Sequence, residues 1–87
     1  MSEETLLEFP CVFPIKAMGR ADADIAGVMV EIVRRHAPCL DESRMTLRPS
    51  SEGKWVAVTL TITATSKAQL DAIYSDLTAH DQIVWAL

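Results

Sequence analysis

The chain opens with a strand-like alternation of apolar and polar positions. Residues 1–8 form a polar lead-in, and residues 9–19 then alternate with a period of two, which predicts a strand. One face of this strand carries Phe13, Ile15 and Ala17. Pro10 and Pro14 cannot donate a hydrogen bond to a neighbouring strand, so the first part of the run is expected at a sheet edge or in the lead-in.

The period then changes to that of a helix. The apolar stripe consists of Ile25, Val28, Met29, Ile32, Val33 and His36. Asp22 and Asp24 are expected in the first turn, where carboxylates suit the helix dipole. Glu31 and Arg35 are spaced to form an ion pair on the exposed face. Pro38 ends the helix, because the residue before a proline avoids the α region.

Two further strands follow, joined by a hairpin. Residues 43–50 alternate, with Met45 and Leu47 expected to face the core. A turn over residues 50–53 includes Gly53, which adopts positive φ easily. The next strand is the clearest element of the chain. Its core face carries Val56, Val58, Leu60, Ile62 and Ala64, and its other face carries small residues and threonines.

A second helix and a short final strand complete the pattern. Ser66 is expected to cap the helix, and Gln69 completes a capping box. The apolar stripe is Leu70, Ile73, Tyr74 and Leu77, and residues 83–87 form the last strand. The order predicts one α+β domain over residues 9–87, a ferredoxin-like β-α-β-β-α-β sandwich with a four-stranded antiparallel sheet and two helices on one face. The threonine face is then open.

Charge and composition narrow the choice of function. The net charge is −4, so phosphate backbones are repelled and no nucleic-acid partner is expected. No apolar stretch approaches the roughly 20 residues of a membrane span, and the acidic start of the chain is unlike a secretory signal. We therefore expect no membrane association and a cytoplasmic location, where Cys11 and Cys39 are reduced thiols.

The residues of catalytic chemistry do not converge in the sequence. His36 lies on the apolar helical stripe and suits a structural or capping role, and His80 lies in a polar loop. The Cys and His spacing is unlike a zinc site, and the glycines are too scattered to cradle a phosphate. We expect no enzyme activity, no metal and no cofactor. A small enzyme that uses His36 or His80 is the alternative.

A binding site, in contrast, is predicted on the open face of the sheet. If Met45 and Leu47 face the core, Arg44 and Arg48 face the open side, and Lys16 joins them beside the threonines. Gly19, which precedes the first helix, is added because the N-terminus of a helix can bind an anion. An RNA-binding sheet would carry stacking aromatics there, and only Trp55 and possibly Trp85 reach that face. A homodimer or another protein is the expected partner.

Several runs together resemble the YbeD-like family of small bacterial proteins of uncharacterised function. The matching runs are Leu6–Pro10, Lys16–Gly19, Arg34–Pro38, Arg48–Ser51 with Gly53, and Val58–Thr65, together with the placing of Tyr74 and Leu77. Their order and spacing carry the resemblance. The chain departs from the family in the loop Cys39–Arg44 and near Asp81.

The resemblance implies a ferredoxin-like fold similar to ACT regulatory domains, which bind small effectors. It also implies a regulatory link to lipoate metabolism, and it supplies no catalytic residue. The expected function is a non-enzymatic regulatory or protein-interaction module. The alternative is an ACT-type sensor of an amino acid or a lipoyl metabolite, and an RNA binder is less favoured.

Overall fold

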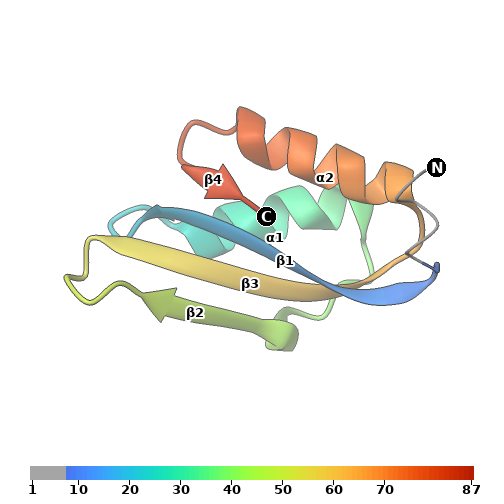
Figure 1. Cartoon of the computed structure of the whole chain (residues 1–87), viewed down its shortest axis with the longest axis horizontal. Helices are drawn as coiled ribbons and strands as arrows, with labels where there is room; N and C mark the ends of the chain where they lie inside the picture. Colours follow the sequence, from blue (N-terminus) through green and yellow to red (C-terminus); the bar gives the residue numbers. More distant parts are fainter. Residues whose placement is uncertain (1–7) are drawn as a thin grey trace.

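The computed structural model describes residues 8–87, so the predicted lead-in lies almost wholly outside the described residues. The elements follow one another in the expected order (Figure 1). They are the strand β1 (Cys11–Arg20), the helix α1 (Ile25–His36), a 3-10 turn η2 (Glu42–Arg44), the strands β2 (Met45–Pro49) and β3 (Trp55–Ala64), the helix α2 (Lys67–Ala79) and the strand β4 (Trp85–Ala86).

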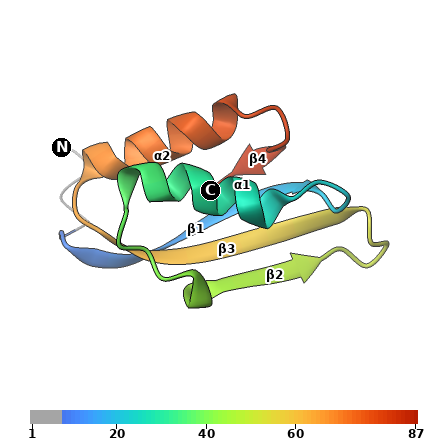
Figure 2. The same cartoon turned by 180° about the vertical axis from the view of Figure 1, so that it is seen from behind.

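The four strands form one antiparallel sheet in the order β2-β3-β1-β4. The central strands pair over their whole length, from Cys11 opposite Ala64 to Arg20 opposite Trp55. In Figure 1 the sheet lies in front of α1, and in Figure 2, seen from behind, α1 lies in front of the sheet. The ferredoxin-like arrangement predicted from the order of elements is confirmed.

The core lies between one face of the sheet and the two helices. On this face Ile15, Val58 and Leu60 are fully buried, and α1 and α2 contribute Met29 and Ile73. Burying a side chain of this size contributes about 1.5–3 kcal/mol to folding. The predicted alternation in β1 and β3 is therefore confirmed, because every second residue of each central strand meets the helices.

Side-chain caps fix where the helices begin. Asp24 caps α1 by accepting a hydrogen bond from the N–H of Gly27 at 3.0 Å. Asp22, which was expected in the first turn, lies outside the helix and pairs with Arg20. Ser66 caps α2 as predicted, accepting from the N–H of Gln69 at 3.1 Å.

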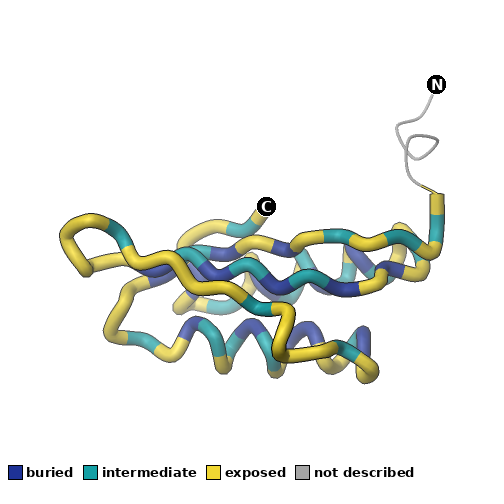
Figure 3. Tube along the Cα trace, turned by 90° about the horizontal axis from the view of Figure 1, so that it is seen from below, coloured by how far each residue is buried: buried dark blue, intermediate teal, exposed yellow. Residues whose placement is uncertain are grey.

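The edge strands are shorter than predicted. β2 begins at Met45 because the preceding residues form the turn η2, and β4 is reduced to two residues. Leu47 lies on the core side of the sheet, as predicted, but 54% of its surface is exposed. Its side chain is on the helix side of the sheet, opposite Val58, but β2 is an edge strand whose residues are mostly exposed (Figure 3).

Candidate functional site

The face of the sheet away from the helices is the candidate site, and we call it the open face. Two rows of side chains cross it. One row runs from Thr46 through Thr59 to Lys16, and the next runs from Arg48 through Ala57 and Met18 to Trp85. On β1 and β3 these are alternating residues whose neighbours on the same strands fill the core. The period-two pattern that builds the core therefore also builds this face.

The strands that carry the open face are basic, although the chain as a whole is acidic. They contain Lys16, Arg20 and Arg48 but no aspartate or glutamate. All the carboxylates of residues 8–87 lie in the helices, η2 and the loops. The sheet is thus a cationic surface on a molecule of net charge −4.

Arg20 is the one of these three cations that has an internal partner. Its guanidinium donates to both carboxylate oxygens of Asp22, at 3.1 and 3.0 Å. The hydrogen bonding and the positive charge of Arg20 lower the pKa of Asp22, and the hydrogen bonding and the negative charge of Asp22 raise the pKa of Arg20. Within residues 8–87, Lys16 and Arg48 make no side-chain hydrogen bond or ion pair, so their charges are available to a ligand or partner.

An apolar patch lies beside these cations. Trp55 and Trp85 are each 38% exposed; Met18 lies on β1 between their strands, opposite Trp85 on one side and Ala57 of β3 on the other. The sequence indicated Trp55 and left Trp85 open, and the structure places both on the open face. Met18 was missed as a functional residue, although its alternation with Ala17 in β1 placed it on this face. Large aromatic side chains beside cations are typical of interaction surfaces.

Arg44 is separated from Lys16 and Arg48. It belongs to η2 and lines a cavity of about 410 Å³ between the loop after α1 and the end of β3, together with Thr61, Thr63 and Leu40. The strand β2 begins at Met45, opposite Leu60, so residues 61–64 of β3 have a strand neighbour on the β1 side only. The loop replaces β2 at this point, and the cavity results from that replacement.

Gly19 lies on the opposite face of the sheet from Lys16. It is buried, and a Cβ at this position would collide with the side chain of Ile25 and with the backbone oxygen of Gln82. This close packing explains why glycine occupies the position, because no larger residue fits there. The structure therefore brings Lys16 and Arg48 onto one face, places Arg44 at its margin and does not bring Gly19 to them.

The two histidines are held by neighbouring groups. His36 Nε2 lies 2.7 Å from an oxygen of Asp76, which joins α1 to α2 and fits the expected structural role. His80 Nδ1 accepts a hydrogen bond from the N–H of Gln82 at 3.2 Å. Residues 8–87 contain no group of three or more His, Cys, Asp or Glu side chains arranged to hold a metal ion.

One further feature concerns membranes. No helix in the described part of the chain combines the length and the apolar character that crossing a bilayer requires.

The fold and the open face define the class of this molecule, a small ferredoxin-like α+β protein with one uncovered sheet face. A family model described as "Protein of unknown function (DUF493)" matches residues 4–87. The chain belongs to this family, and the resemblance to YbeD-like proteins is confirmed.

Relatives and a solved structure agree with this assignment. A UPF0250 protein of Chromobacterium violaceum is 47% identical, with 100% of both chains covered. A UPF0250 protein of Paraburkholderia phytofirmans is 46% identical over 92% of this chain and 90% of its own. The solution structure of HP0495 from H. pylori has a TM-score of 0.70 at 12% identity, covering 100% of this chain and 94% of that one. At this identity the likeness shows the fold alone.

Proposed function

We propose that this protein is a non-enzymatic regulatory module that binds an acidic surface of a partner protein through its open face. The observation that carries the proposal is the composition of that face. It holds the cations Lys16 and Arg48, which have no side-chain partner among residues 8–87, beside the exposed rings of Trp55 and Trp85, and its strands contain no carboxylate.

An acidic protein suits this face better than the other partners considered. Two copies joined face to face would bring their own Lys16 and Arg48 together, and like charges in contact are unfavourable. A nucleic acid would meet only three strand cations on a chain of net charge −4. Exposed aromatic rings beside cations also match the residue types that are enriched at protein interfaces.

The absence of catalysis is part of the same proposal. Both histidines are engaged by Asp76 and by the backbone of Gln82, which supports structural roles for them. The family resemblance suggests proteins of lipoate metabolism as the first partners to examine. Replacing both histidines by glutamine is expected to leave the partner bound and the cellular phenotype unchanged.

Charge reversal on the open face tests the proposal. A tagged wild-type protein and the Arg48→Glu variant would be compared for the amount of each co-purified protein, quantified by mass spectrometry. Lys67→Glu on α2 is the matched control, since it makes the same charge change on the helical side. We expect a specific acidic partner to be lost with Arg48→Glu and kept with Lys67→Glu. Equal recovery with both variants would contradict the role of the open face.

The cavity beside Arg44 favours a second candidate function, a sensor of a small carboxylate effector. Its volume of about 410 Å³ lies in the range of small-ligand sites. Its wall is apolar at Leu40 and Ile62, and the guanidinium of Arg44 makes no ion pair with another described residue. Asp41 lies near enough for Arg44 to contribute to the lowered pKa of that carboxyl, so a ligand with both charges, such as an amino acid, is also suited.

A thermal-melt screen against amino acids, octanoate and lipoate tests this second function. A ligand at about 100 times its dissociation constant adds roughly 2.7 kcal/mol to the free energy of unfolding. The melting temperature of so small a domain would rise by on the order of 10 °C. The shift should disappear in Arg44→Gln and persist in Arg48→Gln. A flat screen would exclude these three ligand classes as effectors.

A further inference from the structure

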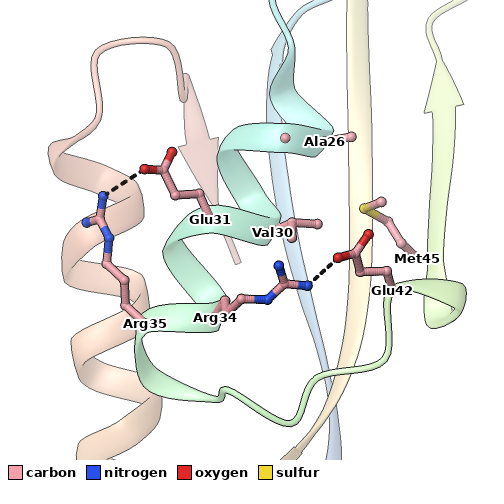
Figure 4. Close-up of a pocket in the computed structure, with 8 residues that line it drawn as sticks. Ala26, Val30, Glu31, Arg34, Arg35, Glu42 and Met45 are labelled. Carbon is pink, nitrogen blue, oxygen red and sulfur yellow. Dashed lines mark hydrogen bonds and ion pairs between the residues drawn. The ribbon is translucent and has the colours of Figure 1, made fainter.

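A groove lies between α1 and the edge strand β2, away from the open face. Figure 4 shows Ala26 and Val30 of α1 on one side and the side chain of Met45 on the other. The hollow measures about 630 Å³, and an ion pair between Arg34 and Glu42 joins its two sides. The lining is mixed: Ala26, Val30 and Met45 supply apolar surface, and the charged residues are two acids and two bases, Glu31, Glu42, Arg34 and Arg35.

A second hollow continues the first along β2. It measures about 340 Å³, shares Ala26 with the first hollow, and is lined on the strand side by Leu47 and Pro49. Met45 and Leu47 are two residues apart on one strand, so the hollows follow each other at about 7 Å. The same spacing separates alternate side chains on one face of an extended peptide.

The backbone of β2 is free along the same edge. The N–H of Ser50 donates to the carbonyl of Trp55 at 2.8 Å, which fixes the even-numbered residues of β2 as those that bond to β3. Leu47 therefore directs its N–H and C=O away from the sheet, and no described strand pairs with that edge. An exposed edge of this kind pairs readily with an added strand.

The arginines in and before β2 favour one kind of added strand over another at this edge. β2 contains Arg48 and is preceded by Arg44, and no carboxylate occurs between Met45 and Pro49. A second copy of β2 would set these arginines along one joined edge, and Pro49, which has no N–H, would weaken the pairing. An extended segment with acidic side chains avoids the repulsion between arginines and brings no second proline to the pairing.

We propose that the free edge of β2 and the adjoining groove form a docking site for an extended acidic peptide segment of a partner protein. The segment adds as a fifth strand beside Leu47. Two alternate apolar side chains enter the hollows at Met45 and Leu47, and the acidic side chains between them lie on the other side of the sheet, near Arg48. This site shares Arg48 with the open face, but its backbone edge at Leu47 and its groove at Ala26 lie outside that face, so binding there can be tested independently of the proposed function.

Nuclear magnetic resonance of the whole chain tests the site with a defined probe. The probe is a short peptide of alternating glutamate and valine, and a peptide of alternating lysine and valine is its control. We expect the acidic peptide to shift the amide signal of Leu47 and the methyl signals of Ala26 and Val30. The basic peptide should bind at least about tenfold more weakly, which corresponds to about 1.4 kcal/mol.

Two variants make the test specific. Ala26→Arg fills the position shared by both hollows, and Ala68→Arg makes the same change on the exposed side of α2. Leu47→Glu provides a second test at an exposed position, where it repels the acidic peptide and the fold tolerates it. We expect Ala26→Arg and Leu47→Glu to lower the affinity at least about tenfold, and Ala68→Arg to leave it unchanged.

Three results would overturn the proposal. The first is an unshifted Leu47 amide at millimolar acidic peptide, and the second is shifts confined to the open face. The third is a Leu47 signal that moves with protein concentration in the absence of peptide, which would assign the edge to a second copy of this chain.

Discussion

At the scale of single residues, Tyr74 carries a buried polar atom whose hydrogen-bonding capacity is not satisfied by any described residue. Its ring packs edge-on against Phe13, with the ring centres 6.5 Å apart, as expected for a member of the apolar stripe of α2. Its hydroxyl oxygen is buried and has no hydrogen-bond partner in the described part of the chain. Burial raises the pKa of this hydroxyl, because the charged phenolate is poorly solvated there.

Removing this hydroxyl is expected to stabilise the protein. Tyr74→Phe keeps the ring and removes an unsatisfied polar atom, so the free energy of unfolding should increase by about 1 kcal/mol. Chemical denaturation at neutral pH measures the change. A loss of stability in this variant would show that the hydroxyl has a partner.

The raised pKa of Tyr74 also predicts a dependence on pH. A folded-state pKa above the unfolded value favours the folded state fully below about pH 10, and this contribution is lost as the pH rises through the folded pKa. Wild-type stability should therefore fall more steeply above pH 10 than that of Tyr74→Phe. Parallel alkaline unfolding curves for the two proteins would contradict the burial of the hydroxyl.

At the scale of elements, Gln69 in the first turn of α2 forms a hydrogen bond to the last residue of α1. Its side-chain oxygen accepts from the N–H of Thr65 at 2.8 Å, and its side-chain nitrogen donates to the carbonyl of His36 at 2.8 Å. The sequence predicted the cap at the start of α2 from Ser66 and Gln69. The bond to His36 could not be predicted, because it depends on the end of α1 lying beside the start of α2.

Truncating Gln69 should therefore cost more than a cap alone. Gln69→Ala removes both hydrogen bonds and is expected to lower the free energy of unfolding by about 1–2 kcal/mol. Lys67→Ala, at an exposed position two residues before Gln69, is the control and should change the free energy of unfolding by less than about 0.5 kcal/mol. Thermal unfolding of the three proteins measures the difference, and equal melting temperatures would refute the link between the helices.

In the strands, alternation predicts the face of a side chain but not how far that side chain is buried. Alternation in β1 and β3 predicted their two faces because both strands are central and have neighbours on each side. The same pattern predicted the face of Leu47 but not its exposure, because an edge strand can direct an apolar side chain toward the helix layer and still leave it exposed. Gly19 was grouped with Lys16 by its position in the chain, whereas the pleat of β1 places the two on opposite faces.

At the scale of the whole molecule, charge and exposure divide the protein into two sides. The helices and loops carry the carboxylates, and the sheet presents Lys16, Arg48 and the rings of Trp55 and Trp85. The sequence predicted an open face with these cations, and it could not predict the apolar patch, because Met18 and Trp85 become neighbours only through the pairing of β1 with β4. The central claim is that this side meets a partner.

Hydroxyl-radical footprinting in a lysate of the source organism, compared with buffer, tests that claim most directly. Met18, Trp55 and Trp85 report on the open face, Met45 reports on the groove beside α1, and the buried Met29 is the internal control. We predict that the two tryptophans and Met18 are protected in the lysate, that this protection is lost in Arg48→Glu, and that Met29 is unchanged. Unaltered oxidation of all three open-face residues in lysate and buffer would contradict the proposed role of the sheet.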